Sequence, residues 1–164
     1  MGTCLEWIVG RGLSNAKSLG ILSQFERERD DLPEETSKER RVNHYPDWWV
    51  KLYNGIEAEI ECKAWTVRPK KYVRNPLDST FWMYDHDTVY ESLAKNWLPN
   101  SKRILVITCV DLFTDGGKRA IKEREISEVL ETLFVARDPD DHEKIRAVTR
   151  DLIETLGRLK GAKT

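Results

Sequence analysis

Apolar and polar residues alternate strictly from position 56 to position 64 of the chain. The even positions are apolar, whereas the odd positions carry Glu57, Glu59, Glu61 and Lys63. Because successive side chains of a strand point to opposite faces, this pattern predicts a strand with one core face and one charged, solvated face. Asn54-Gly55 precedes it and favours a two-residue turn, so Tyr45 to Trp65 is predicted to be an antiparallel hairpin.

Helical periodicity dominates both ends of the chain. Residues Thr3 to Arg29 are expected to form two helices, broken near Gly10-Arg11-Gly12, with Ser14 as the N-cap of the second. Apolar residues at helical spacing predict two further helices, from Ile121 to Val135 and from His142 to Leu159. Asp138-Pro139-Asp140-Asp141 is expected to form the turn between these two helices.

The middle of the chain supplies the remaining elements. Asp30 to Arg41 is highly charged and is expected to be a surface loop or a short helix, and Asp87 to Trp97 is expected to be helical. Arg103 to Val110 contains an unbroken apolar run, which predicts a strand buried on both faces. This order predicts a central mixed sheet flanked by helices, in the α/β to α+β range, as a single domain over residues 1–164.

Composition fits a globular protein and limits how it could bind a partner such as nucleic acid. Hydrophobic residues make up 40% and charged residues 34%, with a formal net charge of −1, so nucleic-acid binding would require a local basic patch. No apolar run approaches the roughly 20 residues needed to span a bilayer, and the N-terminus does not resemble a signal peptide. The scattered Cys4, Cys62 and Cys109 argue against a disulfide framework and predict the reducing cytoplasm.

Three polar residues of the predicted hairpin form a candidate metal site. Glu61 and Lys63 share a face of their strand, and a two-residue turn would put Asp47 opposite about position 62, near both. Two converging carboxylates repel each other unless a cation lies between them, and Mg²⁺ binds one or two carboxylates while keeping water molecules. A metal-bound water has a lowered pKa, and Lys63 could orient or deprotonate it beside a scissile phosphate.

These residues carry a family resemblance. Pro46-Asp47, thirteen intervening residues and Glu61-Cys62-Lys63 resemble the PD-(D/E)xK motif of the restriction-endonuclease-like nuclease superfamily. The resemblance covers roughly Leu5 to Val110 and implies an α-β-β-β-α-β core with the motif on a hairpin. It also implies that Mg²⁺, with Mn²⁺ as a substitute, is held by Asp47, Glu61 and the backbone carbonyl of Cys62.

The resemblance has further implications. Many members add an acidic ligand from the first helix, for which Glu6 and Glu26 are the candidates here. The implied activity is Mg²⁺-dependent endonucleolytic cleavage of DNA, with RNA not distinguished. A homodimer is implied because each active site cuts one strand, and the two predicted C-terminal helices would supply the interface.

A basic segment follows the motif closely. It contains candidate phosphate-binding residues and two aromatic residues that could stack on a base, namely Arg68, Lys70, Lys71 and Arg74 with Trp65 and Tyr72. An ordinary solvated loop is the alternative. Two histidines are weaker candidates: His44 could approach the site but is better interpreted as a loop residue, and His86 with Tyr90 resembles the Gln-x-x-x-Tyr element of one nuclease branch.

Two blander interpretations remain open. The hairpin charges could be alternating surface salt bridges, with Lys51 and Lys63 neutralising the three glutamates. At the level of function, the rival is a non-catalytic nucleic-acid-binding or assembly protein that retains the nuclease fold. Such a protein would have no need of Mg²⁺ at Asp47 and Glu61.

Overall fold

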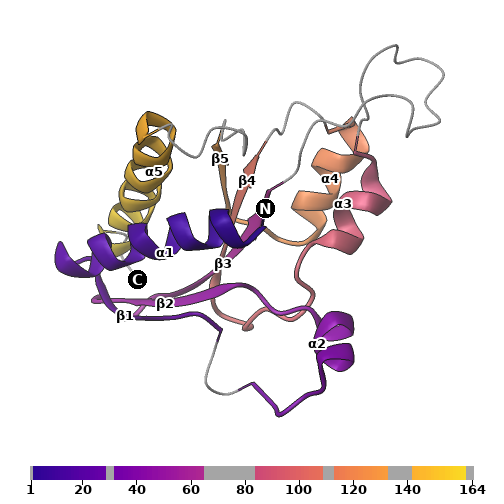
Figure 1. Cartoon of the computed structure of the whole chain (residues 1–164), viewed down its shortest axis with the longest axis horizontal. Helices are drawn as coiled ribbons and strands as arrows, with labels where there is room; N and C mark the ends of the chain where they lie inside the picture. Colours follow the sequence, from indigo (N-terminus) through magenta and orange to yellow (C-terminus); the bar gives the residue numbers. More distant parts are fainter. Residues whose placement is uncertain (1, 29–31, 65–83, 109–112, 133–141, 162–164) are drawn as a thin grey trace.

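A single mixed sheet forms the centre of the protein (Figure 1). The computed structural model describes residues 2–28, 32–64, 84–108, 113–132 and 142–161. The sheet has 5 strands in sequential order, which are β1 (Leu22–Glu26), β2 (Trp48–Leu52), β3 (Glu57–Lys63), β4 (Lys102–Thr108) and β5 (Glu128–Thr132). The strands β1, β2 and β3 form an antiparallel meander, whereas β4 and β5 run parallel to β3.

Helices cover both faces of the sheet. They are α1 (Gly2–Ser18), α2 (Ser37–Asn43), α3 (His86–Ser92), α4 (Asp115–Glu123) and α5 (His142–Gly161). The helices α1 and α5 pack together on one face, and α3 and α4 pack together beside the other (Figure 1). The predicted mixed sheet flanked by helices is thus confirmed. Among the described helices, none combines the length and apolarity that crossing a membrane requires.

The β2–β3 hairpin was predicted correctly, but its turn is one residue longer than expected. The Leu52 amide donates to the Ile56 carbonyl at 2.9 Å, which leaves three residues in the loop. Within it, the Gly55 amide donates to the Leu52 carbonyl at 3.0 Å, and Gly55 has a φ of 86°. This is a turn followed by a left-handed glycine, a common three-residue hairpin connection, and not a two-residue type I′ turn.

The longer loop shifts the strand pairing by one residue. Trp48 pairs with Ile60, so continuing the same register places Asp47 opposite Glu61 and not opposite position 62 as predicted. A shift of one residue matters because neighbouring positions on a strand face opposite sides of the sheet. Asp47 therefore comes to the same side as Glu61.

The charged face of the hairpin is not solvated, contrary to expectation. Glu59 and Glu61 are only 1% and 0% exposed. Glu61 pairs with Leu105 of β4, and Leu105 lies in the apolar cluster formed with α3 and α4. Parallel strands are joined by crossover segments that cover both faces of a sheet, so β3 is buried on both sides where it meets β4.

The N-terminal segment differs from the prediction of two helices. α1 continues through Gly10 and Gly12 as one helix, Ser14 lies inside it, and β1 follows where the second helix was expected. A Cβ at Gly10 would lie 2.7 Å from the Trp48 ring, so this glycine permits a close approach of helix and sheet and does not break the helix. Apolar residues that seemed to continue the helix instead pair β1 with β2, as Phe25 does with Val50.

The predicted helix from Ile121 to Val135 is also wrong. α4 begins earlier, where the Thr114 hydroxyl accepts from the Gly117 amide at 3.1 Å, and the helix ends at Glu123 before the edge strand β5. Gly117 lies in the first turn of α4, where a Cβ would meet the Tyr84 carbonyl oxygen at 2.5 Å.

The other predicted elements are confirmed in full or in part. The C-terminal helix and the strand buried on both faces are confirmed as α5 and β4, and α2 provides the short helix that was one of two expectations. The helix expected over Asp87 to Trp97 exists as α3 but stops at Ser92.

Candidate active site

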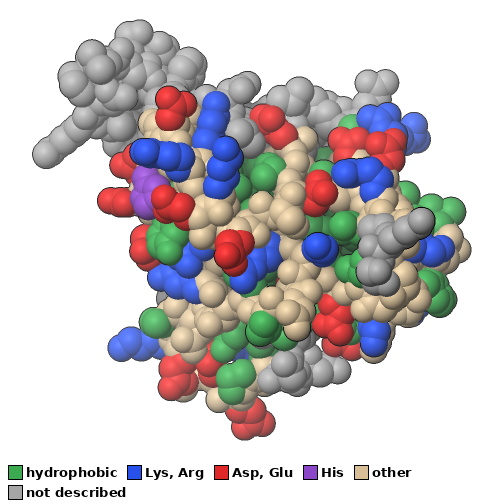
Figure 2. Space-filling view, turned by 180° about the vertical axis from the view of Figure 1, so that it is seen from behind, with side chains coloured by type: hydrophobic (Ala, Val, Ile, Leu, Met, Phe, Trp, Pro, Cys, Tyr) green, Lys and Arg blue, Asp and Glu red, His purple; other side chains and the backbone are tan. Residues whose placement is uncertain are grey.

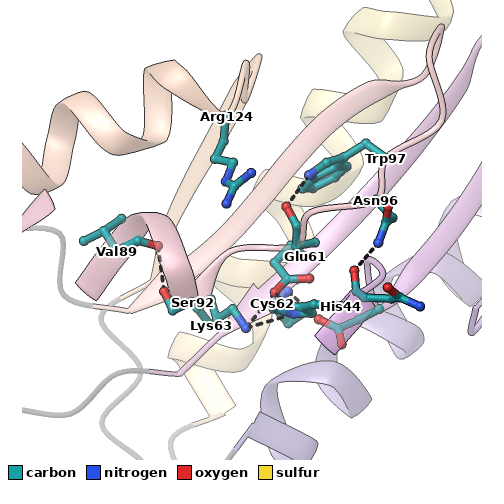
Figure 3. A network of polar contacts seen from close by, with 12 residues as sticks. His44, Glu61, Cys62, Lys63, Val89, Ser92, Asn96, Trp97 and Arg124 are labelled. Carbon is teal, nitrogen blue, oxygen red and sulfur yellow. Dashed lines mark hydrogen bonds and ion pairs between the residues drawn. The ribbon is translucent and has the colours of Figure 1, made fainter. Parts of the chain in front are cut away.

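Glu61 is the centre of a buried ionic cluster on β3 (Figure 3). Its Oε1 atom lies 2.6 Å from Lys63 Nζ and 2.9 Å from His44 Nε2, and these two nitrogens are 3.4 Å apart. The Glu61 side chain is 0% exposed, whereas those of Lys63 and His44 are 19% and 26% exposed. The carboxylate is therefore fully buried behind two basic groups that still reach solvent.

The second carboxylate oxygen of Glu61 has no such contact. Oε2 is buried and lacks both a hydrogen-bond partner and an ionic contact within the part of the chain that the structure describes. A buried, unpartnered carboxylate oxygen is costly because its hydration has been lost without replacement. A cation or a water molecule bound here would remove that cost.

Asp47 lies directly before β2 and faces the same region. Its Oδ2 atom accepts a hydrogen bond of 2.7 Å from the backbone amide of Cys62. Burial and then the negative charge of Glu61 raise the pKa of Asp47 to about 7, although the hydrogen bond from Cys62 and the charge of Lys63 act in the opposite direction. The two carboxylates are thus close enough to repel, as expected of groups that share a cation.

Of the two proposed first-helix ligands, only Glu6 belongs to α1. Its negative charge also raises the pKa of Asp47, which places it on the same side of the molecule, and its Oε2 atom lies 2.5 Å from Arg27 Nη2. Glu26 instead lies in β1, paired with Trp49, so it cannot be a helix-borne ligand. Glu6 is accordingly the acidic residue of the helix that approaches the cluster.

Cys62 separates the two motif residues on β3. Its side chain lies in the apolar cluster under α1 and α5, and burial is the main cause that raises the pKa of its thiol well above the ordinary range. The thiol is therefore a neutral core group. The backbone amide of Cys62 donates to Asp47, and the charges of Asp47 and Glu61 add to burial in raising the pKa of its thiol.

The cluster can hold a divalent cation only in part through side chains. Among the described residues, no three His, Cys, Asp or Glu side chains are placed around one possible ion position. Two carboxylates with water molecules would suit Mg²⁺, which often binds in this way, better than a metal that needs a closed protein cage. The unpartnered Oε2 of Glu61 and the raised pKa of Asp47 both fit a cation held between these residues.

His44 is brought to the site by local structure that the sequence did not reveal. It ends α2 with a φ of 39°, and its carbonyl accepts from the amides of Lys95 and Asn96 at 2.9 and 3.3 Å. These contacts hold its ring against Glu61 (Figure 3). The sequence analysis allowed an approach of His44 to the site but favoured a loop residue; His44 does lie in the loop after α2, and it also contacts Glu61.

The remaining candidates lie elsewhere. His86 stacks on Tyr90 with ring centroids 5.4 Å apart, and its nitrogens contact Asp87 and Glu123. These acidic partners raise the pKa of His86, which is surface chemistry separate from the contacts of Glu61. The basic segment with its two aromatic residues, from Trp65 to Arg74, lies outside the described residues.

No known protein family, curated protein or solved structure matches this chain.

Proposed function

We propose that the protein is a Mg²⁺-dependent nuclease that hydrolyses phosphodiester bonds in DNA and belongs to the restriction-endonuclease-like superfamily. The observation that carries the proposal is the convergence of Asp47, Glu61 and Lys63, with Glu61 Oε2 buried and unpartnered among the described residues. The order α1, β1, β2, β3, α3, β4 is compatible with the core that the motif implies. The short helix α2 is then an insertion between β1 and β2.

The chemistry assigns a role to each residue. Asp47, Glu61 and the Cys62 carbonyl would hold Mg²⁺, which supplies a water of lowered pKa and stabilises charge on the phosphate. Lys63 is partly exposed and reaches the edge of the cluster, so its ammonium can orient the attacking water and contact the scissile phosphate. His44 contacts the same Glu61 oxygen and limits how that carboxylate can turn.

The structural alternative explains less of the site. A Glu61–Lys63 ion pair kept only for stability would gain little, because burying two charges costs about as much as their attraction returns. It would also leave Asp47 unexplained, since a second carboxylate next to Glu61 adds repulsion and raises the pKa of Asp47 to about 7. A functional cation accounts for both carboxylates at once.

The rival functional class is a non-catalytic nucleic-acid-binding or assembly protein with this fold. Calorimetric titration with Mg²⁺ and Mn²⁺ separates the two, because only the nuclease needs a metal at Asp47 and Glu61. We expect binding to the parent and its loss in Asp47→Asn. Incubation of single-stranded, duplex and branched DNA and of RNA with Mg²⁺ or with EDTA then tests cleavage itself and identifies the substrate.

DNA as the substrate and a homodimer as the working form are parts of the same proposal. The dimer interface suggested from two C-terminal helices must be reconsidered, because the first of these is the helix α4 followed by the strand β5, and α5 packs on α1.

A further inference from the structure

A hollow lies on the surface between α1 and the sheet, where β1 ends and β2 begins. Its volume is about 290 Å³, near the lower end of ligand sites, which run from about 300 to 1,000 Å³. The residues that line it are Glu6, Trp7, Gly10, Arg11, Ser14, Arg27 and Trp48. Five of these, from Glu6 to Ser14, recur at helical spacing, so one side of α1 forms a wall.

The walls of the hollow combine aromatic rings with cationic groups. Trp7 is 57% exposed, unusually so for the largest apolar side chain, and the Arg11 guanidinium lies 5.0 Å from the centre of its ring. Trp48 closes the hollow from the sheet side, where its ring rests against Gly10. An exposed ring with a guanidinium on it suits a flat π-system that carries a neighbouring negative charge.

The hollow adjoins the proposed active site through one residue. Glu6 lines the hollow, is paired with Arg27 at 2.5 Å, and contributes to the raised pKa of Asp47 through its charge. Trp48, which also lines the hollow, directly follows Asp47 in the chain, so a nucleic-acid strand with a phosphate at the cluster can continue toward the hollow.

We propose that this hollow binds one unstacked base of a nucleic acid, with Trp7 as the stacking platform and Arg11 contacting an adjacent phosphate. It follows that the preferred substrate is single-stranded or has a single-stranded end or flap, because bases inside a duplex are stacked and cannot enter. This substrate class rests on the proposed nuclease function, whereas binding of the base does not require cleavage.

The test measures binding without cleavage. A fluorescently labelled single-stranded oligonucleotide and a blunt duplex of the same sequence are titrated with the full chain in EDTA. Trp7→Ala should weaken binding of the single strand by roughly 5- to 100-fold, the effect of losing one base–aromatic stack, and should leave duplex binding unchanged. Trp7→Phe keeps a ring and should retain most of the affinity. Leu19→Ala removes an equally exposed apolar residue outside the hollow and should have no effect.

Two results of the binding titrations would overturn the proposal. One is equal affinity of Trp7→Ala and the parent for the single strand, and the other is an equal loss for single strand and duplex. A second copy of the chain could fill the hollow instead of a base, and size-exclusion chromatography tests this. If the parent is a dimer and Trp7→Ala is a monomer, base binding is contradicted as well. Failure of the nuclease is distinguishable, since a chain that cuts nothing in Mg²⁺ can still show the Trp7-dependent preference for a single strand.

Discussion

At the scale of single residues, Glu61 has the most demanding environment of the described chain. It is a fully buried carboxylate that touches one ammonium and one imidazole through a single oxygen. Such a pair contributes little net stability, but removing one partner leaves a buried charge without compensation. Glu61 is therefore tolerated in the interior because Lys63 and His44, which both reach solvent, contact it.

The effects of substitutions at Glu61 and Lys63 on the free energy of unfolding should consequently be non-additive. In EDTA, Lys63→Met alone should lower the free energy of unfolding by up to about 3–5 kcal/mol, because the buried Glu61 carboxyl loses one of the two basic groups that contact it. The double variant Glu61→Gln with Lys63→Met removes both charges and should be more stable than the sum of the two single changes predicts. Urea denaturation of all four proteins measures this, and strict additivity would show that the two groups do not interact.

Asp47 makes stability depend on pH. Its pKa is raised from 3.8 to about 7 in the folded chain, mainly by burial and then by Glu61, so the folded chain holds a proton that the unfolded chain has released. Between about pH 4 and 7 the folded state binds more protons, so stability falls as the pH rises, with a slope of up to about 1.4 kcal/mol per pH unit.

Asp47→Asn should flatten this dependence, because the amide does not titrate and can still accept from the Cys62 amide. Thermal or urea unfolding in EDTA at several pH values measures it, with Asp151→Asn on the surface of α5 as the control. If the parent and Asp47→Asn show parallel pH profiles, the carboxyl of Asp47 is not perturbed in the way described. Added Mg²⁺ should stabilise the parent most above pH 7, where Asp47 is ionised.

The sequence could indicate the motif residues but not their surroundings. The spacing of Asp47, Glu61 and Lys63 on a hairpin was visible because strand alternation has a strict period of two. The burial of Glu61 was not visible in the sequence, because it depends on β4, which is far away in the chain. His44 was ranked low for a similar reason: the end of α2 and the contacts with Lys95 and Asn96 place it, and neither has a local signature.

At the scale of elements, the packing requires a glycine at one helix position but not at another. Gly10 faces the sheet, where a Cβ would lie 2.7 Å from Trp48, whereas a Cβ at Gly157 of α5 would meet nothing within 4 Å. Glycine costs about 1 kcal/mol relative to alanine inside a helix. The cost at Gly10 is offset by close packing between α1 and β2, but at Gly157 nothing in the packing requires it.

The two glycines therefore form a matched pair of variants. Gly157→Ala should raise the free energy of unfolding by about 0.5–1 kcal/mol, because alanine restricts the unfolded chain and fits the helix. Gly10→Ala should lower it by about 1–3 kcal/mol, since the Trp48 ring must move. Chemical denaturation checks both, and a stabilising Gly10→Ala would mean that α1 does not approach the sheet as closely as described.

Errors in predicting elements had identifiable physical causes. Leu22 and Phe25 are three residues apart, which fits a helix, but they face the same core from β1 because its pairing with β2 shifts register between Leu22 and Gln24. The same ambiguity affected β5, whose Val129 and Leu130 pair with β4. The hairpin turn depended on whether Asn54 or only Gly55 takes a positive φ, which the dipeptide alone does not determine.

At the scale of the whole molecule, charge is balanced and mixed. Figure 2 shows Lys and Arg side chains interspersed with Asp and Glu over one face of the protein, in agreement with the net charge of −1. Such a surface does not attract nucleic acid strongly by its overall field, so affinity must come from local groups near the site. The fold places Asp47 and Lys63 at the ends of β2 and β3 that lie away from their hairpin turn, and Trp48, which lines the hollow, directly follows Asp47.

The most direct test of the account is the rate of strand cleavage by the parent and by Asp47→Asn at a fixed Mg²⁺ concentration, on a panel of single-stranded, flapped and duplex DNA. We expect cleavage by the parent that EDTA abolishes, and a loss of at least about 100-fold in Asp47→Asn, because the metal that activates the water loses a ligand. Asp151→Asn should cut like the parent. Cleavage by Asp47→Asn at the parent rate, or no Mg²⁺- or Mn²⁺-dependent cleavage of any form by the folded parent, would contradict the assignment of a nuclease site to Asp47, Glu61 and Lys63.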